Sequence, residues 1–223
     1  MPPKQLRLKL GTSAALTRES FVVSDTNAEA RAALDAWPAW HAGCLALVGP
    51  AGAGKSHLAR AWAARVKAVV FDGRTPLAGL QGRPVLLEDA DRGGDEETLF
   101  HLINMAPARG AGLLVTARTA PQTWPARVPD LRSRLNALAV AEIGEPDDAV
   151  LEGVLRKFFR ERNIRPADDV YPYLLRRIER SVPAALDIVT RLDEAADDEQ
   201  REITRLLARQ ILENEGETLN LFD

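Results

Sequence analysis

The stretch GPAGAGKS, residues 49–56, decides the fold of this chain. Four residues separate its first glycine from a Gly-Lys-Ser triplet, which is the spacing of a phosphate-binding loop. The apolar run LALV precedes the loop, and an amphipathic helical pattern over 56–66 follows it. Glycines let backbone N–H groups converge on phosphate oxygens, and the N-terminus of the following helix adds partial positive charge. The loop therefore predicts a binding site for a nucleoside diphosphate or triphosphate.

Within this loop, Lys55 is placed to reach the β- and γ-phosphates and the Ser56 hydroxyl to ligate Mg²⁺. Such a site needs acids at the end of another strand, and VLLEDAD supplies Glu88, Asp89 and Asp91. We expect Glu88 to hold the metal through water and Asp89 to be the second acid; solvated loop residues are the alternative. In the usual order of these two acids, an aspartate that holds the metal comes first. Because glutamate is one methylene longer, we expect nucleotide binding with weak or no hydrolysis by the chain itself.

Short apolar runs alternate with helical patterns over the first two-thirds of the chain. This alternation is typical of βα units that build a parallel sheet covered by helices on both faces, so the predicted class is α/β. The expected strands are 21–23, 45–48, 69–71, 85–87, 113–116 and 138–143, and the expected helices between them are 28–37, 56–66 and 96–108.

The last third of the chain contains no strand-like run. Pro146 followed by Asp147 and Asp148 is a typical helix start, because acidic side chains favour the positive end of a helix. Expected helices cover about 147–162, 168–180, 183–196 and 199–214. We therefore expect an N-terminal arm over 1–18, an α/β domain over 19–145 and a helical domain over 146–223.

The composition excludes several classes of protein. A hydrophobic fraction of 46% is typical of a globular protein, and a net charge of −3 argues against gripping nucleic acid through the overall field. No stretch has the length and apolarity of a membrane span, so we expect a cytoplasmic protein with no membrane partner. The single cysteine, Cys44, precedes an apolar run and is expected to be buried and inert.

The arm contains QLRLKL, residues 5–10, in which Leu6, Leu8 and Leu10 form one apolar edge of an extended segment. Two interpretations follow from the residues alone. The segment either pairs as an edge strand with the domain's own sheet or docks on another protein.

Several stretches resemble motifs of the AAA+ ATPases, and in detail those of the bacterial DnaA initiator family. FVVSDTNAEARAAL, residues 21–34, is similar to the segment that opens the family's nucleotide domain. GPAGAGKSHLARAW resembles its phosphate loop, including the histidine after the serine. LRSRLNAL, residues 131–138, is similar to the arginine-finger box, and RSVPAALDIV, residues 180–189, to the sensor-2 helix of the lid. The resemblance covers about residues 19–215.

This resemblance implies an AAA+ P-loop sheet flanked by helices and followed by a small all-helical lid. It also implies roles for particular residues. The backbone around Phe21, Val22 and Val23 would cup the adenine, and Arg134 would be an arginine finger acting in trans. The cofactor would be ADP or ATP with Mg²⁺, held by the residues that match the family's motifs: Gly52, Ala53, Gly54, Lys55, Ser56, His57 and Arg180.

Two departures from the family pattern are visible. The initiator carries a C-terminal helix-turn-helix DNA-binding domain, and this chain, ending at Asp223, is expected to lack one. In the sensor-1 stretch LLVTARTAP, Arg118 stands where the family has an aspartate, and Thr116 is the nearest neutral candidate. Arg118, together with the Glu88–Asp89 order, favours a regulator that holds nucleotide over a motor that hydrolyses it.

Short family members without the DNA-binding domain form the Hda group, regulators that inactivate DnaA. They carry an N-terminal Gln-Leu-x-Leu-x-Leu peptide that docks on the DNA polymerase sliding clamp. Gln5, Leu6, Leu8 and Leu10 are similar to it, which favours docking over the edge strand. The resemblance implies negative regulation of replication initiation, with DnaA and the clamp as partners, DNA contacted only through the clamp, and possible homo-oligomers.

Two other functions remain open on the sequence. An autonomous ATPase that loads a helicase or another replication factor would need competent acids of its own. A clamp-bound adaptor with a structural nucleotide would not need Arg134. The tail TLNLFD ends in the alternating apolar residues Leu219, Leu221 and Phe222, for which docking against the lid is favoured over imitation of the clamp ligand.

Overall fold

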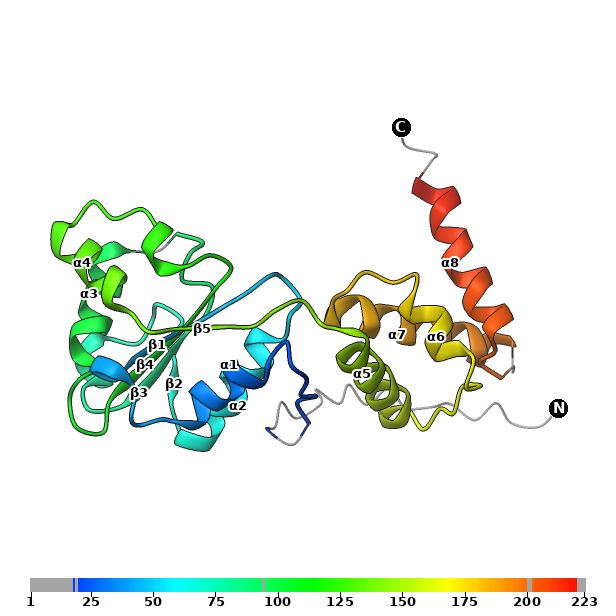
Figure 1. Cartoon of the computed structure of the whole chain (residues 1–223), viewed down its shortest axis with the longest axis horizontal. Coiled ribbons are helices and arrows are strands. Elements are labelled where there is room, and N and C mark those ends of the chain that lie inside the picture. The colour runs from blue at the N-terminus through cyan, green and yellow to red at the C-terminus, as the bar shows by residue number, and fades with distance from the viewer. Residues whose placement is uncertain (1–17, 19, 94, 200–201, 220–223) are drawn as a thin grey trace.

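The structure is a computed structural model that describes residues 18–219 apart from 19, 94, 200 and 201. The described residues form two lobes, an α/β lobe at the left of Figure 1 and a helical lobe at the right. The chain segment that follows β5 passes from the first lobe to the second.

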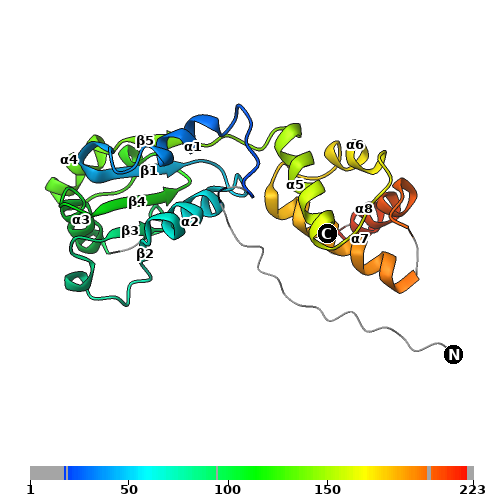
Figure 2. The ribbon, with the colours of Figure 1, turned by 90° about the horizontal axis from the view of Figure 1, so that it is seen from below.

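The α/β lobe is built on a parallel sheet with the strand order β2-β3-β4-β1-β5 (Figure 2). Its central pair, β1 and β4, runs in register from Cys44 opposite Leu113 to Val48 opposite Ala117. The predicted parallel sheet is therefore confirmed. The strands are β1 (Cys44–Val48), β2 (Val69–Val70), β3 (Pro84–Leu87), β4 (Gly112–Ala117) and β5 (Val140–Glu142).

Helices cover both faces of this sheet because its strands are apolar on both sides. In β1, Leu45 and Leu47 join the core under α1 and α2, whereas Ala46 and Val48 join the core under α3 and α4. The helices are α1 (Ala28–Asp35), α2 (Lys55–Val66), α3 (Glu96–Met105) and α4 (Pro129–Ala137), with short 3₁₀ turns η1 (His41–Gly43), η2 (Leu77–Leu80) and η3 (Pro121–Thr123).

The expected strand over 21–23 is wrong. The structure has no strand there, and the segment lies between the two lobes instead. Val22 packs against α5 so closely that a Cβ added to Gly153 would lie 2.8 Å from its Cγ1. The Val22 carbonyl accepts a hydrogen bond from the Asn27 side chain rather than from a neighbouring strand. The β-branched residues of this segment therefore serve contact between the lobes, a role that a short apolar run does not distinguish from a strand.

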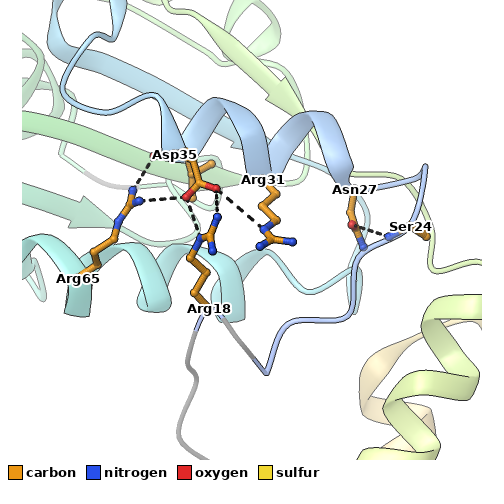
Figure 3. Close-up of polar contacts among 7 residues, drawn as sticks. Arg18, Ser24, Asn27, Arg31, Asp35 and Arg65 are labelled. Atoms are coloured by element: carbon orange, nitrogen blue, oxygen red, sulfur yellow. Dashed lines mark hydrogen bonds and ion pairs between the residues drawn. The ribbon is translucent and has the colours of Figure 1, made fainter.

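A cluster of arginines around Asp35 holds the start of the described chain on the outside of α1 and α2 (Figure 3). Arg18 donates from Nε and Nη2 to the two carboxylate oxygens at 3.0 and 2.6 Å, and Arg65 of α2 donates to the same carboxylate at 3.0 Å. The Arg31 Nε atom lies 4.0 Å from Oδ2 of Asp35. The hydrogen bond from Arg18 lowers the pKa of Asp35, although partial burial acts in the opposite direction.

The helical lobe has its own apolar core, centred on Phe159, Leu155 and Val189. The predicted start of its first helix is confirmed, because the Asp147 side chain accepts from the Val150 N–H at 2.8 Å as an N-cap. Its helices are α5 (Asp148–Glu161), α6 (Val170–Leu175), α7 (Val182–Glu199) and α8 (Arg205–Leu219).

The last helix begins later than the expected residue 199. Ile203 is buried in the core of the lobe, and its carbonyl accepts from the Ala167 N–H at 3.1 Å. Ile203 makes this hydrogen bond outside any helix, and α8 starts at Arg205. Within the described helices, none combines the length and apolarity needed to cross a membrane.

Candidate nucleotide site and arginine finger

The phosphate loop connects the carboxyl end of β1 to α2. The Gly49 N–H donates to the Ala117 carbonyl of β4 at 3.2 Å, which holds the first loop residue beside the neighbouring strand. Gly52 and Gly54 have φ values of 73° and 97°, a region that glycine enters without strain. Because α2 begins at Lys55, its unpaired N–H groups face the loop. This geometry fits the phosphates of a nucleotide.

Lys55 is a nearly buried cation, with 8% of its surface exposed. Its Nζ donates to the carbonyls of Gly49 and Pro50 at 2.6 and 2.7 Å. Burial lowers the pKa of Lys55, while the charge of Asp89 acts to raise it. The two carbonyls therefore position the ammonium at the loop before any phosphate arrives. Ser56, the next residue, is exposed in the first turn of α2.

The helical lobe rests directly on this loop. The Val182 N–H at the start of α7 donates to the Gly52 carbonyl at 3.0 Å. A Cβ added to Gly52 would lie 2.5 Å from the Cβ of Ser181 and 3.2 Å from Cδ of Pro183. Ala53, the next loop residue, is also buried. The predicted sensor-2 segment and the phosphate loop, far apart in the sequence, are thus neighbours.

Arg180 precedes this contact and turns toward the connection between the lobes. Its Nε donates to the Pro146 carbonyl at 3.2 Å and its Nη2 to Asp148 at 2.7 Å. Both side chains of the ion pair remain partly exposed, so Arg180 can exchange Asp148 for a phosphate at modest cost. Its contact with nucleotide stays a prediction.

The predicted adenine side of the site brings Phe21 and His57 together. Their rings meet edge to face with centroids 5.4 Å apart, and His57 Nε2 lies 3.2 Å from the Ser20 hydroxyl. The Phe21 ring also closes over the loop, because a Cβ added to Gly54 would lie 3.3 Å from it. The predicted adenine segment and phosphate loop are therefore in contact.

Asn27 also shapes this region, a role that was not predicted from the sequence. It is buried, and its side chain donates to the Val22 carbonyl at 3.0 Å and accepts from the Ser24 N–H at 3.1 Å (Figure 3). These bonds fix the curve of the predicted adenine-binding backbone, where Val23 stays partly exposed. An asparagine just before a helix is a local signal, but it predicts an N-cap, and here the side chain points back instead.

The acids after β3 are engaged within the protein. Arg60 of α2 donates from Nε and Nη2 to one oxygen of Glu88, at 3.0 and 2.7 Å. Asp89 has a positive φ of 51° and lies 3.6 Å from Arg92. Both acids were predictable from the sequence and neither arginine was, because nothing in the local pattern pairs them.

Asp91, the third acid, organises the end of β4. Its Oδ2 accepts from the backbone N–H groups of Arg118 and Thr119 at 2.8 and 3.1 Å. Thr116, the neutral sensor-1 candidate, is buried, and its hydroxyl accepts from the Asp89 N–H at 3.0 Å. The side chain of Arg118 is exposed beside this arrangement.

The two predicted components of the cofactor fit the site unequally. The loop, its glycines and Lys55 fit a nucleotide. A magnesium ion between Ser56 and Glu88 does not fit as well, because Arg60 holds the Glu88 carboxylate. Across the described ranges, no group of three or more acidic, histidine or cysteine side chains is arranged to hold a metal ion.

The two arginines of the finger box differ in their surroundings. Arg132 donates to the carbonyls of Gln122 and Trp124 at 2.9 and 2.6 Å, so it braces the loop before α4. Arg134, two residues on, is exposed and makes no hydrogen bond or ion pair with any residue that the structure describes. Leu135 beside it is fully buried and anchors the helix.

Arg134 lies near the opposite end of β1 from the phosphate loop. Its charge acts on Cys44, the first residue of β1, although burial dominates and raises the pKa of that thiol to about 12. The strand from Cys44 to Val48 spans about 13 Å at 3.3 Å per residue. Arg134 is thus placed away from its own loop, and the predicted burial of Cys44 is confirmed.

Comparisons with known proteins agree with this architecture. Residues 148–212 match the family model of the Hda lid domain. The fold resembles that of domain III of the Thermotoga maritima replication initiation protein DnaA, with a TM-score of 0.75 and 18% identity over 89% of this chain and 96% of that one. The chain thus has a fold similar to that of DnaA domain III, and its residues 148–212 match the Hda lid domain. The predicted AAA+ fold class and helical lid are therefore confirmed.

Two further proteins extend the comparison. AMPPCP-bound DnaA from Aquifex aeolicus has a TM-score of 0.66 and 19% identity over 83% of this chain and 67% of that one. A Haemophilus influenzae protein without an assigned function is 28% identical over 185 residues, which are 74% of this chain and 79% of its own. The predicted clamp-binding residues and the tail residues Leu221 and Phe222 lie outside the described residues.

Proposed function

We propose that this chain is a nucleotide-holding regulator of chromosome replication initiation that inserts Arg134 into the ATP site of a DnaA initiator. The lid family and the DnaA-like fold support a role in replication. The observation that carries the proposal is the exposure of Arg134 away from its own phosphate loop. An arginine so placed is available to stabilise charge in a neighbour's site.

Hydrolysis in that site converts the ATP form of the initiator to its ADP form and so represses initiation. An arginine finger contributes roughly 10³–10⁵ to the rate of phosphoryl transfer. The chemistry takes place in the partner, and this chain supplies one cation. Its own ATPase activity is weak or absent, because Glu88 and Asp89 face arginines of the same chain.

The chain's own nucleotide, ADP or ATP, holds the lobes in place. The loop and Lys55 bind its phosphates, the Phe21–Val23 segment takes the adenine, and Arg180 links the lid to the phosphates. A DnaA of similar fold is known with AMPPCP bound, which supports an adenine nucleotide. A magnesium ion between Ser56 and Glu88 would require Glu88 to part from Arg60.

The N-terminal arm docks the protein on the sliding clamp in the cytoplasm, and DNA is reached only through the clamp. Three leucines at alternate positions, each worth roughly 1.5–3 kcal/mol when buried, give moderate affinity after ordering costs. Replacing Gln5 and Leu8 together by alanine is expected to abolish capture on the clamp and leave the melting temperature unchanged. A double variant that still binds the clamp but melts several degrees lower would make the arm a structural strand.

Arg134→Ala tests the proposed mechanism. Stimulation of the initiator's ATP hydrolysis, measured with clamp-loaded DNA, is expected to fall at least about tenfold, since a finger supplies far more than that where it acts. Clamp capture and nucleotide affinity should stay at the wild-type level. Arg127→Ala, at another exposed arginine close to α4, is the matched control and should stimulate normally. Normal stimulation by Arg134→Ala would instead favour the adaptor function.

A further inference from the structure

The Arg60–Glu88 pair lies beside the phosphate loop. Arg60 is four residues after Ser56 on α2, so both side chains project from the same face of the helix. That face looks toward the end of β3, where Glu88 is mostly shielded, with 19% of its side chain exposed. Both guanidinium donors meet the same carboxylate oxygen, and this hydrogen bond raises the pKa of Arg60. A positive charge is therefore already paired with Oε2 of Glu88, the acid that was predicted to hold the metal ion.

The other two acids of this loop are also engaged. Asp89 turns to Arg92, and Asp91 accepts the backbone N–H groups that follow β4. Each carboxylate thus has a partner within the chain. The other oxygen of Asp91, Oδ1, is buried without a hydrogen-bond partner among the described residues. The obstacle to a hydrated divalent cation is therefore the Arg60 guanidinium at Glu88, because Mg²⁺ needs closely defined oxygen ligands.

A second cation stands on the phosphate side of the site. Arg118 follows Ala117, whose carbonyl holds the N–H of the first loop residue, Gly49, at 3.2 Å. Asp91 fixes the Arg118 backbone, while the Arg118 side chain is exposed and forms no hydrogen bond or ion pair within the described part of the chain. Its charge reaches Lys55, where it adds to the effect of burial in lowering the pKa of that lysine.

We propose that this chain binds nucleotide without a divalent cation, with Arg60 in place of the metal beside Glu88 and with Arg118 assisting Lys55 at the phosphates. The inference rests on the proposed nucleotide binding. Guanidinium groups suit this task, because they are always charged and form charge-assisted hydrogen bonds to carboxylate and phosphate oxygens. The bound nucleotide is then held but not hydrolysed.

The test is the affinity of the full chain for ADP, measured by calorimetry in excess EDTA and in excess Mg²⁺. The wild-type dissociation constants are expected to agree within about threefold, a small difference on the free-energy scale of binding. Arg118→Ala should weaken ADP binding in EDTA roughly tenfold, as expected for one charge-assisted contact with a phosphate. Wild-type binding that weakens tenfold or more in EDTA overturns the inference.

Arg60→Ala tests directly whether Arg60 takes the place of a metal ion beside Glu88. With Arg60 removed, Glu88 becomes available, and ADP binding should become roughly tenfold tighter with Mg²⁺ than with EDTA. Mn²⁺ added to the ADP complex and followed by electron paramagnetic resonance should bind to Arg60→Ala and not to wild type. Arg65→Ala is the matched control, because Arg65 lies on the same helix and is paired with a different carboxylate.

The outcomes separate this inference from the proposed function. The inference is overturned if the ADP affinity of Arg60→Ala depends on Mg²⁺ no more than that of wild type, or if the wild-type ADP complex binds Mn²⁺. Either result leaves the proposed nucleotide site unaffected. No ADP binding under either condition would remove the nucleotide site itself. Arg60 is 55% exposed at its side chain, so the variant is expected to fold, which a melting curve checks.

Discussion

At the carboxyl end of β1 the charged groups other than Arg118 have partners within the chain, whereas near its amino end Arg134 is exposed without a partner among the described residues. Lys55 is bonded to loop carbonyls, and Glu88 and Asp89 face arginines. The difference indicates two tasks. One end is arranged to hold a ligand in a fixed shape, and the other keeps a cation available for a partner.

Lys55→Ala should have the largest effect of these variants. The effect should be a loss of ADP affinity and should be confined to the carboxyl end of β1. Losing a charge-assisted contact with phosphate is worth up to about 3 kcal/mol, so ADP affinity should fall roughly a hundredfold. Calorimetry with ADP measures it, and Arg134→Ala provides the control, with affinity within about threefold of wild type. If both variants lost ADP affinity equally, the two ends of β1 would be coupled. The assignment of separate tasks to the two ends would then be wrong.

Gly52→Ala tests whether the lid depends on the loop. The substitution must tolerate a positive φ and a contact of 2.5 Å with the Cβ of Ser181, which moves only with the lid backbone. We expect the free energy of unfolding to drop by about 2–3 kcal/mol in urea denaturation. Gly73→Ala is the matched control, because Gly73 has a φ of 81° and no atom within 4 Å of the added Cβ; it should lose about 1 kcal/mol. Equal losses would mean that the lid contact contributes nothing.

Arg132→Ala and Arg134→Ala should separate structural from functional arginines within one helix. Arg132 donates two hydrogen bonds to backbone carbonyls, so its loss should lower the free energy of unfolding by about 1–2 kcal/mol. Arg134→Ala should change it by less than about 0.5 kcal/mol, as for other exposed residues. Thermal denaturation of the two variants measures both changes in the free energy of unfolding. A larger loss for Arg134→Ala would show that Arg134 braces its own domain.

Much of the fold was predictable from short-range patterns. The apolar run over 45–48, placed between helical patterns, predicted a strand of a parallel sheet covered on both faces, and the structure confirms it. Pro146 and the two aspartates that follow it predicted the start of α5, and in the structure Asp147 is its N-cap. The segment 21–23 was assigned wrongly, because an apolar run is equally compatible with a strand and with packing between lobes.

The sequence by itself determined the phosphate loop, most of the strands and helices and the helical character of the last third, because glycines, caps and apolar periodicity act over a few neighbouring residues. Only the tertiary structure decided which charges meet. Arg60 and Glu88 are 28 residues apart, and their contact depends on how α2 lies against β3. In the same way, packing of α4 against the preceding loop pairs Arg132 with carbonyls and leaves Arg134 exposed. Such pairings arise from three-dimensional packing, which local sequence patterns do not encode.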